Sequence, residues 1–263
     1  MDLAGRTALV TGANRGIGRA LVERLAAEPL GQILAGVRSV DRFAPVERPG
    51  GPQIRPVRMD LSSRERIDAS CEELGDELRG IDLLVNNAGV MTGGLLEEQD
   101  MDSVYAMFQV NLVAVAHLTH RVLPGMLERG SGKIVNNASI SGYAYFPAAT
   151  TYAASKAGVV ALTESLRREL RGTGVQTLHL VTPGVDTDML DATEDTYGRH
   201  LDTSDWDKIS PAEWADKVVA AIRSDARVLS PGGKTGFAKL ASRGPSWVLD
   251  AASRRMFSRS PRR

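Results

Sequence analysis

The sequence predicts a single doubly wound α/β domain, in which a parallel sheet of about seven strands carries helices on both faces. Three observations lead to this prediction. Short apolar runs typical of buried strands alternate along the chain with longer segments of helical periodicity. A glycine-rich turn joins the first such strand to the first helix. Polar residues and glycines follow the strands where each strand ends, which is the edge at which α/β sheets bind ligands.

The composition fits one domain and gives no indication of nucleic-acid binding or of a membrane-spanning helix. The 263 residues are 43% hydrophobic, which is enough for a large core, and the formal net charge of zero gives no reason to expect nucleic acid. The single cysteine, Cys71, can form no internal disulfide, which fits a reducing, cytoplasmic location. No apolar run reaches the ~18 residues of a membrane-spanning helix, and the first residues lack the apolar region of a signal peptide. No metal site is predicted.

The first strand and helix form a predicted anion site. The strand at Thr7–Val10 leads into the turn Thr11–Gly18, which opens a helix that runs to about residue 29. The glycines let the backbone approach a pyrophosphate, and the free N–H groups of the helix stabilise its charge. The spacing is Gly-x-x-x-Gly-x-Gly rather than the Gly-x-Gly-x-x-Gly of the dinucleotide fingerprint. An ordinary glycine-rich turn is the alternative in a chain with 26 glycines.

The second strand, Gln32–Val37, lacks an acidic residue at its end. In dinucleotide folds an acid there binds the ribose 2′-OH of NAD, whereas a basic residue suits the extra phosphate of NADP. Val37 occupies the acidic position and Arg38 follows it, while Arg15 in the glycine-rich turn could reach the same phosphate. The sequence therefore favours NADP. The alternative is that both arginines are solvated surface charges.

The same patterns predict the other elements. Residues 40–52 are rich in Pro, Gly and charge and are expected to be a loop. Ser62 and Glu65 form a predicted capping box that opens a helix reaching about residue 79. Asn111 lies inside a long predicted helix, either as a surface residue or at a local break that frees a backbone carbonyl. We expect strands at 53–59, 81–85, 133–138, 175–181 and 227–230, and helices at 100–129, at 152–171 and from Ser210-Pro211 onward.

Tyr152 and Lys156 are four residues apart and should share one face of a helix. A lysine cation one turn away favours the phenolate and lowers the pKa of the tyrosine, as general acid–base catalysis near pH 7 requires. A half-buried tyrosine beside a surface lysine is the alternative. The surrounding sequence favours catalysis, because five predicted strand ends converge on the edge where this pair would lie. The residues at these ends are Gly12, Asp60, Asn87, Ser139 and Thr182–Gly184.

Taken together, these motifs resemble the short-chain dehydrogenase/reductase family. The resemblance extends over about residues 5–185 and implies a Rossmann-type fold. It also implies an NADP(H)-dependent oxidoreductase that interconverts a small-molecule carbonyl and alcohol by hydride transfer. The matching segments, in the family's order, are Thr11–Gly18, Asp60-Leu61, Asn86–Gly89, Asn111, Ser139, Tyr152-x-x-x-Lys156 and Pro183-Gly184.

The resemblance also implies roles for individual residues. Tyr152 would be the general acid or base, with Ser139 bonded to the substrate oxygen and Lys156 lowering the pKa of the tyrosine. Asn111 would hold a water on the proton path, and Asp60 would meet the adenine ring. The predicted catalytic residues are Asn111, Ser139, Tyr152 and Lys156. The predicted cofactor-binding residues are Gly12, Asn14, Arg15, Gly16, Ile17, Gly18, Arg38, Asp60, Leu61, Asn87, Ala88, Gly89, Tyr152, Lys156, Pro183, Gly184, Val185 and Thr187.

The last third of the chain departs from the family pattern. Thr187 comes one residue earlier after Pro183-Gly184 than the family's carboxamide-binding threonine. The family's frequent Val-Asp-Gly-Gly segment is missing, which puts its tetramer contacts in doubt. We assign residues 1–231 to the catalytic domain and 232–263 to a basic tail, and we expect a homodimer or homotetramer through the helices at 100–129 and 152–171.

Residues 186–210 form a predicted substrate lid, in which Tyr197 or Trp206 could select the substrate and His200 is expected at the surface. A solvated acidic face is the alternative for this segment. In the tail, residues 246–257 can form an amphipathic helix, with Val248, Ala252 and Met256 spaced four apart. That helix could pack on its own domain, contact a partner subunit or adsorb to an anionic membrane.

Two other functions use the same fold. A non-catalytic NADP-binding regulator is disfavoured by the intact set of Asn111, Ser139, Tyr152 and Lys156, because a sensor does not need an acid–base pair. A nucleotide-sugar epimerase or dehydratase also pairs tyrosine with lysine. It is disfavoured by the short chain and by the glycine spacing of the first turn.

Overall fold

The computed structural model describes residues 1–202, 208–224, 226–230, 232 and 256–260. The predicted lid residue Trp206 and residues 246–255 of the predicted tail helix lie outside these residues. The assignment of 232–263 to a separate tail stays a prediction.

Within the described residues, seven parallel strands form one sheet in the order β3-β2-β1-β4-β5-β6-β9. This confirms the predicted doubly wound sheet. The strand order reverses between β1 and β4, and such a switch point places a ligand crevice at the carboxyl ends of the strands. The strands are β1 (Thr7–Thr11), β2 (Gln32–Val37), β3 (Gln53–Arg58), β4 (Leu83–Asn86), β5 (Gly132–Asn137), β6 (Val175–Leu180) and β9 (Val228–Leu229). A second, two-stranded sheet pairs β7 (Gly184–Val185) with β8 (Lys208–Ile209).

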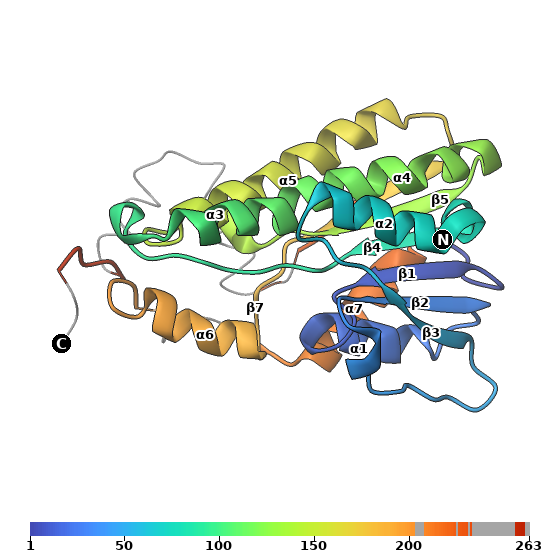
Figure 1. Ribbon diagram of the computed structural model, residues 1–263, viewed down its shortest axis with the longest axis horizontal. Coiled ribbons are helices and arrows are strands. Elements are labelled where there is room, and N and C mark those ends of the chain that lie inside the picture. The colour runs from blue at the N-terminus through green and yellow to red at the C-terminus, as the bar shows by residue number, and fades with distance from the viewer. Residues whose placement is uncertain (203–207, 225, 231, 233–255, 261–263) are drawn as a thin grey trace.

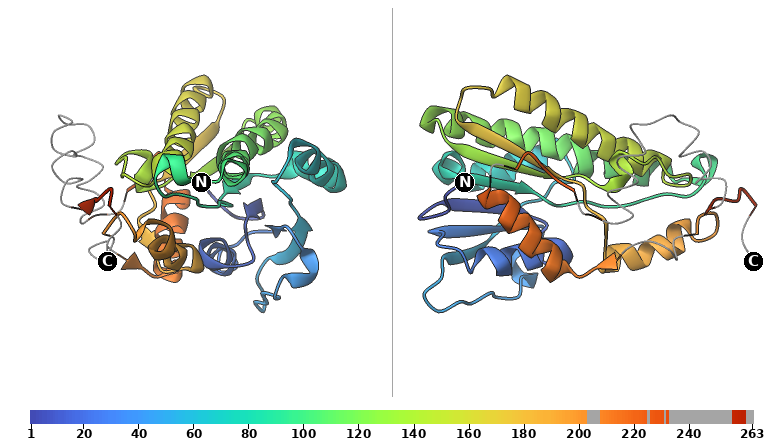
Figure 2. Two further views of the ribbon diagram at one scale, coloured as in Figure 1. Left: turned by 60° about the vertical axis from the view of Figure 1, so that its left-hand side comes forward. Right: turned by 180° about the vertical axis from the view of Figure 1, so that it is seen from behind.

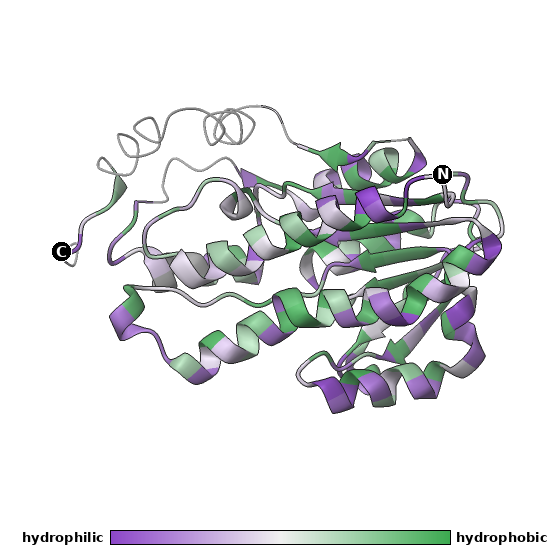
Figure 3. Cartoon of the chain, turned by 90° about the horizontal axis from the view of Figure 1, so that it is seen from above, coloured by the Kyte–Doolittle hydropathy of each residue, from purple (hydrophilic) through white to green (hydrophobic). Residues whose placement is uncertain are grey.

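Helices cover both faces of the large sheet (Figure 1). One face packs against α1 (Gly16–Leu25) and α7 (Pro211–Arg223), and the other against α2 (Arg64–Leu74), α4 (Ala114–Arg129) and α5 (Thr150–Glu169). Successive strand residues point to opposite faces, so Ala8 and Val10 enter the first core and Leu9 the second. Because both faces are buried, the central strands β1, β2 and β4 are mostly apolar. Figure 3 shows this hydrophobic centre of the sheet.

Three predicted helix boundaries are wrong. The first helix, α1, ends at Leu25 rather than near residue 29. The helix after β3, α2, is not capped by Ser62 as predicted. Ser63, one residue later, caps it by accepting a hydrogen bond from the Arg66 N–H at 3.3 Å. That helix also ends at Leu74, after which Gly75 takes a positive φ of 53° and the chain continues as a 3₁₀ segment. The 3₁₀ segments are Val40–Arg42, Gly75–Gly80, Leu96–Glu98 and Ile140–Gly142.

The long helix predicted at 100–129 is interrupted. It consists of α3 (Met101–Phe108), a π-helical turn at Gln109–Val113 and α4. The side chain of Asp100 caps α3 by accepting from the Ser103 N–H at 3.0 Å. Asn111 lies in the π turn and is only 1% exposed, so the expectation of a local break is confirmed and the surface alternative is wrong. Such π turns often mark functional sites.

A short helix, α6 (Asp188–Tyr197), lies beyond the carboxyl ends of the strands, apart from the two layers (Figures 1 and 2). The chain then returns to the sheet through α7, whose predicted cap is confirmed. Ser210 accepts from the Glu213 N–H at 3.1 Å, and Pro211 stands in the first turn. Near α6, His200 is only 3% exposed, so its expected surface position is wrong. Its ring packs beside Phe257, with the ring centroids 6.4 Å apart.

Candidate active site

The glycine-rich turn between β1 and α1 brings three backbone segments into close approach. Gly12 has a positive φ of 67°, and a Cβ atom added there would lie 2.9 Å from the Cα atom of Ala88. A Cβ atom at Gly18 would lie 2.1 Å from the carbonyl oxygen of Gly12. Only glycine fits at both positions, and the first turn of α1 therefore presents its N–H groups at the sheet edge. The predicted residues Asn14, Arg15, Gly16 and Ile17 lie in this turn.

A chain of polar side chains ties together four neighbouring strand ends. The Thr11 hydroxyl oxygen accepts from the N–H groups of Asn87 and Ala88, both at 3.0 Å. The Asn137 amide donates to the Asn87 side chain at 3.0 Å, and the Thr182 hydroxyl donates to the Asn137 side chain at 2.5 Å. The ends of β1, β4, β5 and β6 are thereby held in register at the predicted site.

Asn137 belongs to this network of polar side chains and was not predicted from the sequence. Its backbone carbonyl also accepts from the Lys156 Nζ at 3.0 Å, so it contacts both the strand-end network and the predicted catalytic helix. The signal in the sequence was its place at the end of a strand, two residues before Ser139. That signal was not distinctive, because Asn136 precedes it and faces the core instead.

The predicted catalytic pair lies on α5, as expected. Lys156 Nζ is 5.8 Å from the centroid of the Tyr152 ring. The hydroxyl of Ser139, which follows β5, lies close enough to the Tyr152 phenol to lower its pKa. The structure therefore brings Ser139, Tyr152 and Lys156 together at the carboxyl edge of the sheet.

Asn111 joins this group from the π turn. Its side-chain oxygen accepts from the Val90 N–H at 2.9 Å, and its amide donates to the Val90 carbonyl at 2.8 Å. Both bonds fix the loop that follows β4. A Cβ atom added at Gly89 would lie 3.4 Å from the Asn111 side-chain oxygen and 3.5 Å from Lys156 Nζ. Gly89 thus leaves the backbone open beside both residues. The expected role of Asn111 in holding a water stays a prediction.

Burial shifts the pKa values of the catalytic pair in opposite directions. It raises the pKa of Tyr152 to about 12, against the opposing effect of the Ser139 hydroxyl. It lowers the pKa of Lys156 to about 8. The expected lowering of the pKa of Tyr152 by Lys156 is not seen, because removal of the phenol from water dominates. At neutral pH the tyrosine is protonated and the lysine is mostly charged.

The predicted adenosine-side residues lie at the ends of β2 and β3. Burial alone would raise the pKa of Asp60, but hydrogen bonds from Ser62 and Arg66 outweigh it and hold that pKa below its ordinary value. The carboxylate accepts from the Arg66 guanidinium at 2.6 Å. Leu61 follows it and is buried, whereas Arg38 is exposed at the end of β2.

The segment after β6 passes over the glycine-rich turn. Pro183 leads into Gly184 and Val185 of β7, and Thr187 then reaches the turn. A Cβ atom added at Gly16 would lie 3.2 Å from the Thr187 methyl carbon. One residue further on, Asp188 forms an exposed ion pair with Arg15 at 3.0 Å. The predicted cofactor-binding residues of this segment therefore lie against the cradle.

The end of α6 lies near Tyr152. Tyr197 is 2% exposed, and a Cβ atom added at Gly93 would lie 1.9 Å from its ring, so the ring contacts that glycine closely. Burial raises the pKa of Tyr197, and the nearby Tyr152 raises it further. Tyr197 packs in an apolar cluster with Ala148, Ala149 and Leu201.

Residues 256–260, which we call the tail clasp, close this cluster from outside. The Asp202 N–H donates to the Met256 carbonyl at 2.9 Å, and the Ser258 N–H donates to the His200 carbonyl at 2.8 Å. Met256 and Phe257 pack against the Tyr197 cluster. Arg259 forms an ion pair with Glu97 on the other side. These described residues of the tail pack on their own domain.

A doubly wound sheet with a glycine cradle at its switch point and a serine–tyrosine–lysine group beside it defines a nucleotide-dependent oxidoreductase. The sequence profile of the family described as short chain dehydrogenase matches residues 6–198. The chain belongs to the short-chain dehydrogenase/reductase family.

Individual relatives and solved structures support the same family. The 3-oxoacyl-(acyl-carrier-protein) reductase FabG of Vibrio harveyi is 36% identical over 196 residues, which is 74% of this chain and 80% of the relative. A short chain dehydrogenase from Burkholderia cenocepacia, solved in complex with NADP, has a TM-score of 0.81 and 27% identity, and the match covers 96% of this chain and 99% of that one. A metagenomic short-chain oxidoreductase, also in complex with NADP, has a TM-score of 0.69 and 28% identity over 87% and 97% of the two chains.

The expectations of family, fold and an NADP-dependent oxidoreductase acting on a carbonyl or alcohol are therefore confirmed. Among the described residues, no helix is both long enough and apolar enough to span a membrane. Nor do those residues contain a cluster of three or more potential metal ligands.

Proposed function

We propose that this protein is an NADPH-dependent reductase of a small-molecule carbonyl compound, with Tyr152 as the general acid. The observation that carries the proposal is the close grouping of Ser139 and Tyr152, with Lys156 beside them, next to the glycine cradle. A substrate oxygen placed between the two hydroxyls would accept a hydrogen bond from each. The developing negative charge on that oxygen is then stabilised by Ser139 and neutralised by the Tyr152 proton.

The cradle fits a dinucleotide, since Gly12 and Gly18 let the end of β1 and the first turn of α1 pack closely together, and Gly89 leaves the backbone open beside Lys156. The turn at Gly16–Gly18 would hold the pyrophosphate, and Asp60 with Asn87–Gly89 would line the adenosine side. When bound, the nicotinamide would supply the hydride. Arg15 and Arg38 would meet the 2′-phosphate, which is why we propose NADP rather than NAD. Asn14, Ile17, Leu61, Pro183–Val185 and Thr187 complete the proposed contacts.

The protonation states favour reduction. A phenol with a pKa of about 12 holds its proton at neutral pH and is ready to donate it. As the proton leaves, the Lys156 ammonium one turn away stabilises the phenolate that forms. Lys156 is in turn fixed by its bond to the Asn137 carbonyl, and Asn111 holds the adjoining loop. We propose that a water bound near Asn111 returns the proton from solvent.

We further propose that the protein is cytoplasmic and forms a homodimer or homotetramer through the segment 100–129 and α5. Met101, Tyr105 and Val113 are exposed apolar side chains on that segment, and Tyr105 is 70% exposed. A second copy of the chain would cover them.

The test is NADPH consumption with a panel of ketones, aldehydes and quinones, with NADH in parallel. Wild type should turn over at least one carbonyl compound with NADPH, and Tyr152→Phe should lose about 10²-fold or more in kcat because it lacks the acid. Tyr145→Phe, which alters an exposed phenol in the loop after Ser139, is the matched control and should keep full activity. Preference for NADH would contradict the roles of Arg15 and Arg38. NADPH binding without any turnover would favour a regulatory protein.

A further inference from the structure

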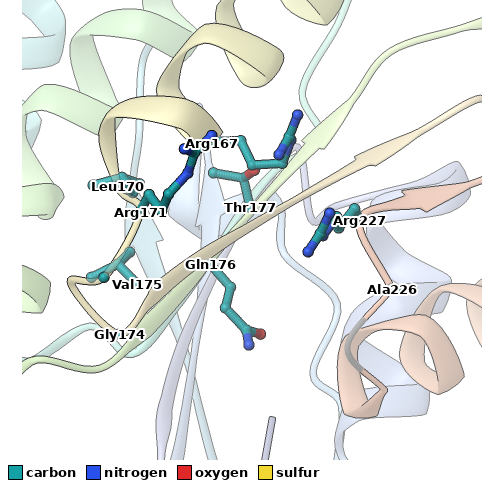
Figure 4. A pocket seen from close by; sticks show the side chains of 10 residues that line it. Arg167, Leu170, Arg171, Gly174, Val175, Gln176, Thr177, Ala226 and Arg227 are labelled. Carbon is teal, nitrogen blue, oxygen red and sulfur yellow. The ribbon is translucent and has the colours of Figure 1, made fainter.

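A second pocket lies at the opposite edge of the sheet from the active site. It has a volume of about 510 Å³ and is formed at the amino end of β6, the end of α5 and the segment entering β9. Figure 4 shows its lining side chains, with Arg167 coming from α5, Arg171 from the turn after α5, Thr177 from β6 and Arg227 from the segment before β9. A pocket of this size accommodates a small organic molecule.

The charge of the pocket is strongly positive. Three arginines line it, and Arg167 is the one that contacts a carboxylate, that of Glu164 at 2.9 Å. The guanidinium groups of Arg171 and Arg227 form no ion pair with any residue that the structure describes. Two guanidinium groups that line one concave site and have no counter-charge among the described residues suit an anionic ligand, because each can donate two parallel hydrogen bonds to an oxyanion.

A buried hydroxyl in the pocket wall points to the same ligand. Thr177 is 3% exposed, and its hydroxyl has no hydrogen-bond partner among the described residues. A buried polar group without a partner destabilises the folded state, and valine would have the same shape without that penalty. A ligand oxygen that accepts a hydrogen bond from this hydroxyl would explain why the position holds threonine rather than valine.

We propose that this pocket binds the phosphate group of a small phosphorylated molecule. Arg171 and Arg227 would hold the phosphate oxygens from two sides, and the Thr177 hydroxyl would donate to a third oxygen. Arg167 would contribute its remaining donors while paired with Glu164. Phosphate is favoured over a carboxylate because the donors that line the pocket come from three separate segments of the chain, which suits a tetrahedral anion better than a planar one.

Hydrogen exchange of the protein titrated with inorganic pyrophosphate tests the proposal, because it reports where the anion binds as well as how tightly. Pyrophosphate should slow exchange in residues 172–177, apart from any effect at the glycine cradle. Arg171→Ala and Arg227→Ala should each raise the pyrophosphate concentration needed for this protection by about tenfold or more. Thr177→Val should raise it several-fold while leaving the protein at least as stable.

The matched control is Arg168→Ala, which removes an exposed arginine of the same helix that does not line the pocket. It should change the protection midpoint by less than about twofold. Equal weakening in Arg168→Ala would show nonspecific attraction and overturn the proposal, as would the lack of protection at 172–177. Protection by citrate at concentrations where pyrophosphate gives none would overturn the assignment to phosphate.

Discussion

At the scale of single residues, one physical cause acts on both catalytic side chains with opposite results. Removal from water disfavours the charged form of each, so the pKa of Tyr152 rises and that of Lys156 falls. Near neutral pH the tyrosine is thus held as an acid, and the lysine is close to the pH at which it loses its charge. The rate of proton donation should therefore depend on the lysine rather than on the tyrosine.

The pH dependence of carbonyl reduction should show this directly. As pH rises through about 8, Lys156 loses the proton that makes it a cation, so kcat/KM should fall above that pH. Tyr152, with a pKa of about 12, stays protonated and should add no step below that value. Lys156→Arg keeps the positive charge at high pH, so its activity, even if lower, should lack the decline near pH 8. A wild-type profile that stays flat up to about pH 10 would contradict this assignment.

The catalytic residues were predictable because their signal is local. Tyr152 and Lys156 share a helix face by spacing alone, and the glycine turn is contiguous in sequence. Asn137 was not predictable in this way. Its contacts with Asn87 and Thr182 arise only when the strands align. The pKa of Tyr152 was misjudged for a related reason, since burial of the phenol depends on elements distant in sequence.

At the scale of elements, β5 and α7 are joined by a buried cation. Lys133 lies in β5 and is 0% exposed, and its Nζ donates to the carbonyl oxygens of Ile222 and Ser224, both at 2.8 Å. These carbonyls belong to the end of α7, where a helix leaves its last acceptors unsatisfied and carries partial negative charge. The lysine therefore completes the hydrogen bonding of a helix on one face from a strand in the centre.

Replacing this cation should weaken the whole domain. Lys133→Met keeps the length of the side chain but removes the buried cation from the end of α7, where the Ile222 carbonyl keeps only its bond from the Met1 ammonium at 3.2 Å. We expect the free energy of unfolding to fall by about 2–4 kcal/mol. Urea unfolding followed by circular dichroism measures the change. Lys217→Met, on the exposed surface of α7, is the control and should change it by less than about 0.5 kcal/mol. Equal stability of the two variants would show that Lys133 is not needed as a cap.

The break between α3 and α4 shows why some elements escape prediction. Residues 100–129 have continuous helical periodicity, which is why one helix was expected. The π turn is held by the two bonds of Asn111 to Val90 in a separate loop, and this interaction is not visible in the local sequence. The Ser63 cap differs from the predicted Ser62 cap by one residue, which is the usual uncertainty of helix ends.

At the scale of the whole molecule, the carboxyl edge of the sheet has a side that would bind the nucleotide and a side that would bind the substrate. The two sides are built differently. The nucleotide side is formed by strand ends and tight turns within the core. The proposed substrate side is formed by α6, the segment that follows it and the tail clasp, and Leu201 of that segment pairs with Phe257 of the clasp. The alternation of strands and helices predicted the first part well. The docking of the clasp could not be predicted, because it depends on the shape of an apolar cluster built from four separate segments.

Loss of the clasp should loosen the substrate side alone. Phe257→Ala removes an aromatic ring from the Tyr197 cluster, so hydrogen exchange should become faster in residues 188–202 and stay unchanged in β1 and α1. KM for the carbonyl substrate should rise while binding of NADPH stays unchanged. Arg259→Ala, which removes an exposed ion pair of the same segment, should have little effect on either measurement. Faster exchange throughout the sheet would show that the clasp supports the fold rather than the substrate side.

The position of the clasp also affects the order in which the enzyme matures. Synthesis adds residues from the N-terminus at about 5–20 per second, and domains begin to fold as they emerge. The six strands from β1 to β6 and the glycine cradle are complete well before Met256 and Phe257 are made. A growing chain would therefore acquire its nucleotide site first and pass through a stage with an open substrate side. Translation that stops after β9 and before Met256 would include α7, which covers one face of the sheet, but would leave the Tyr197 cluster without the clasp.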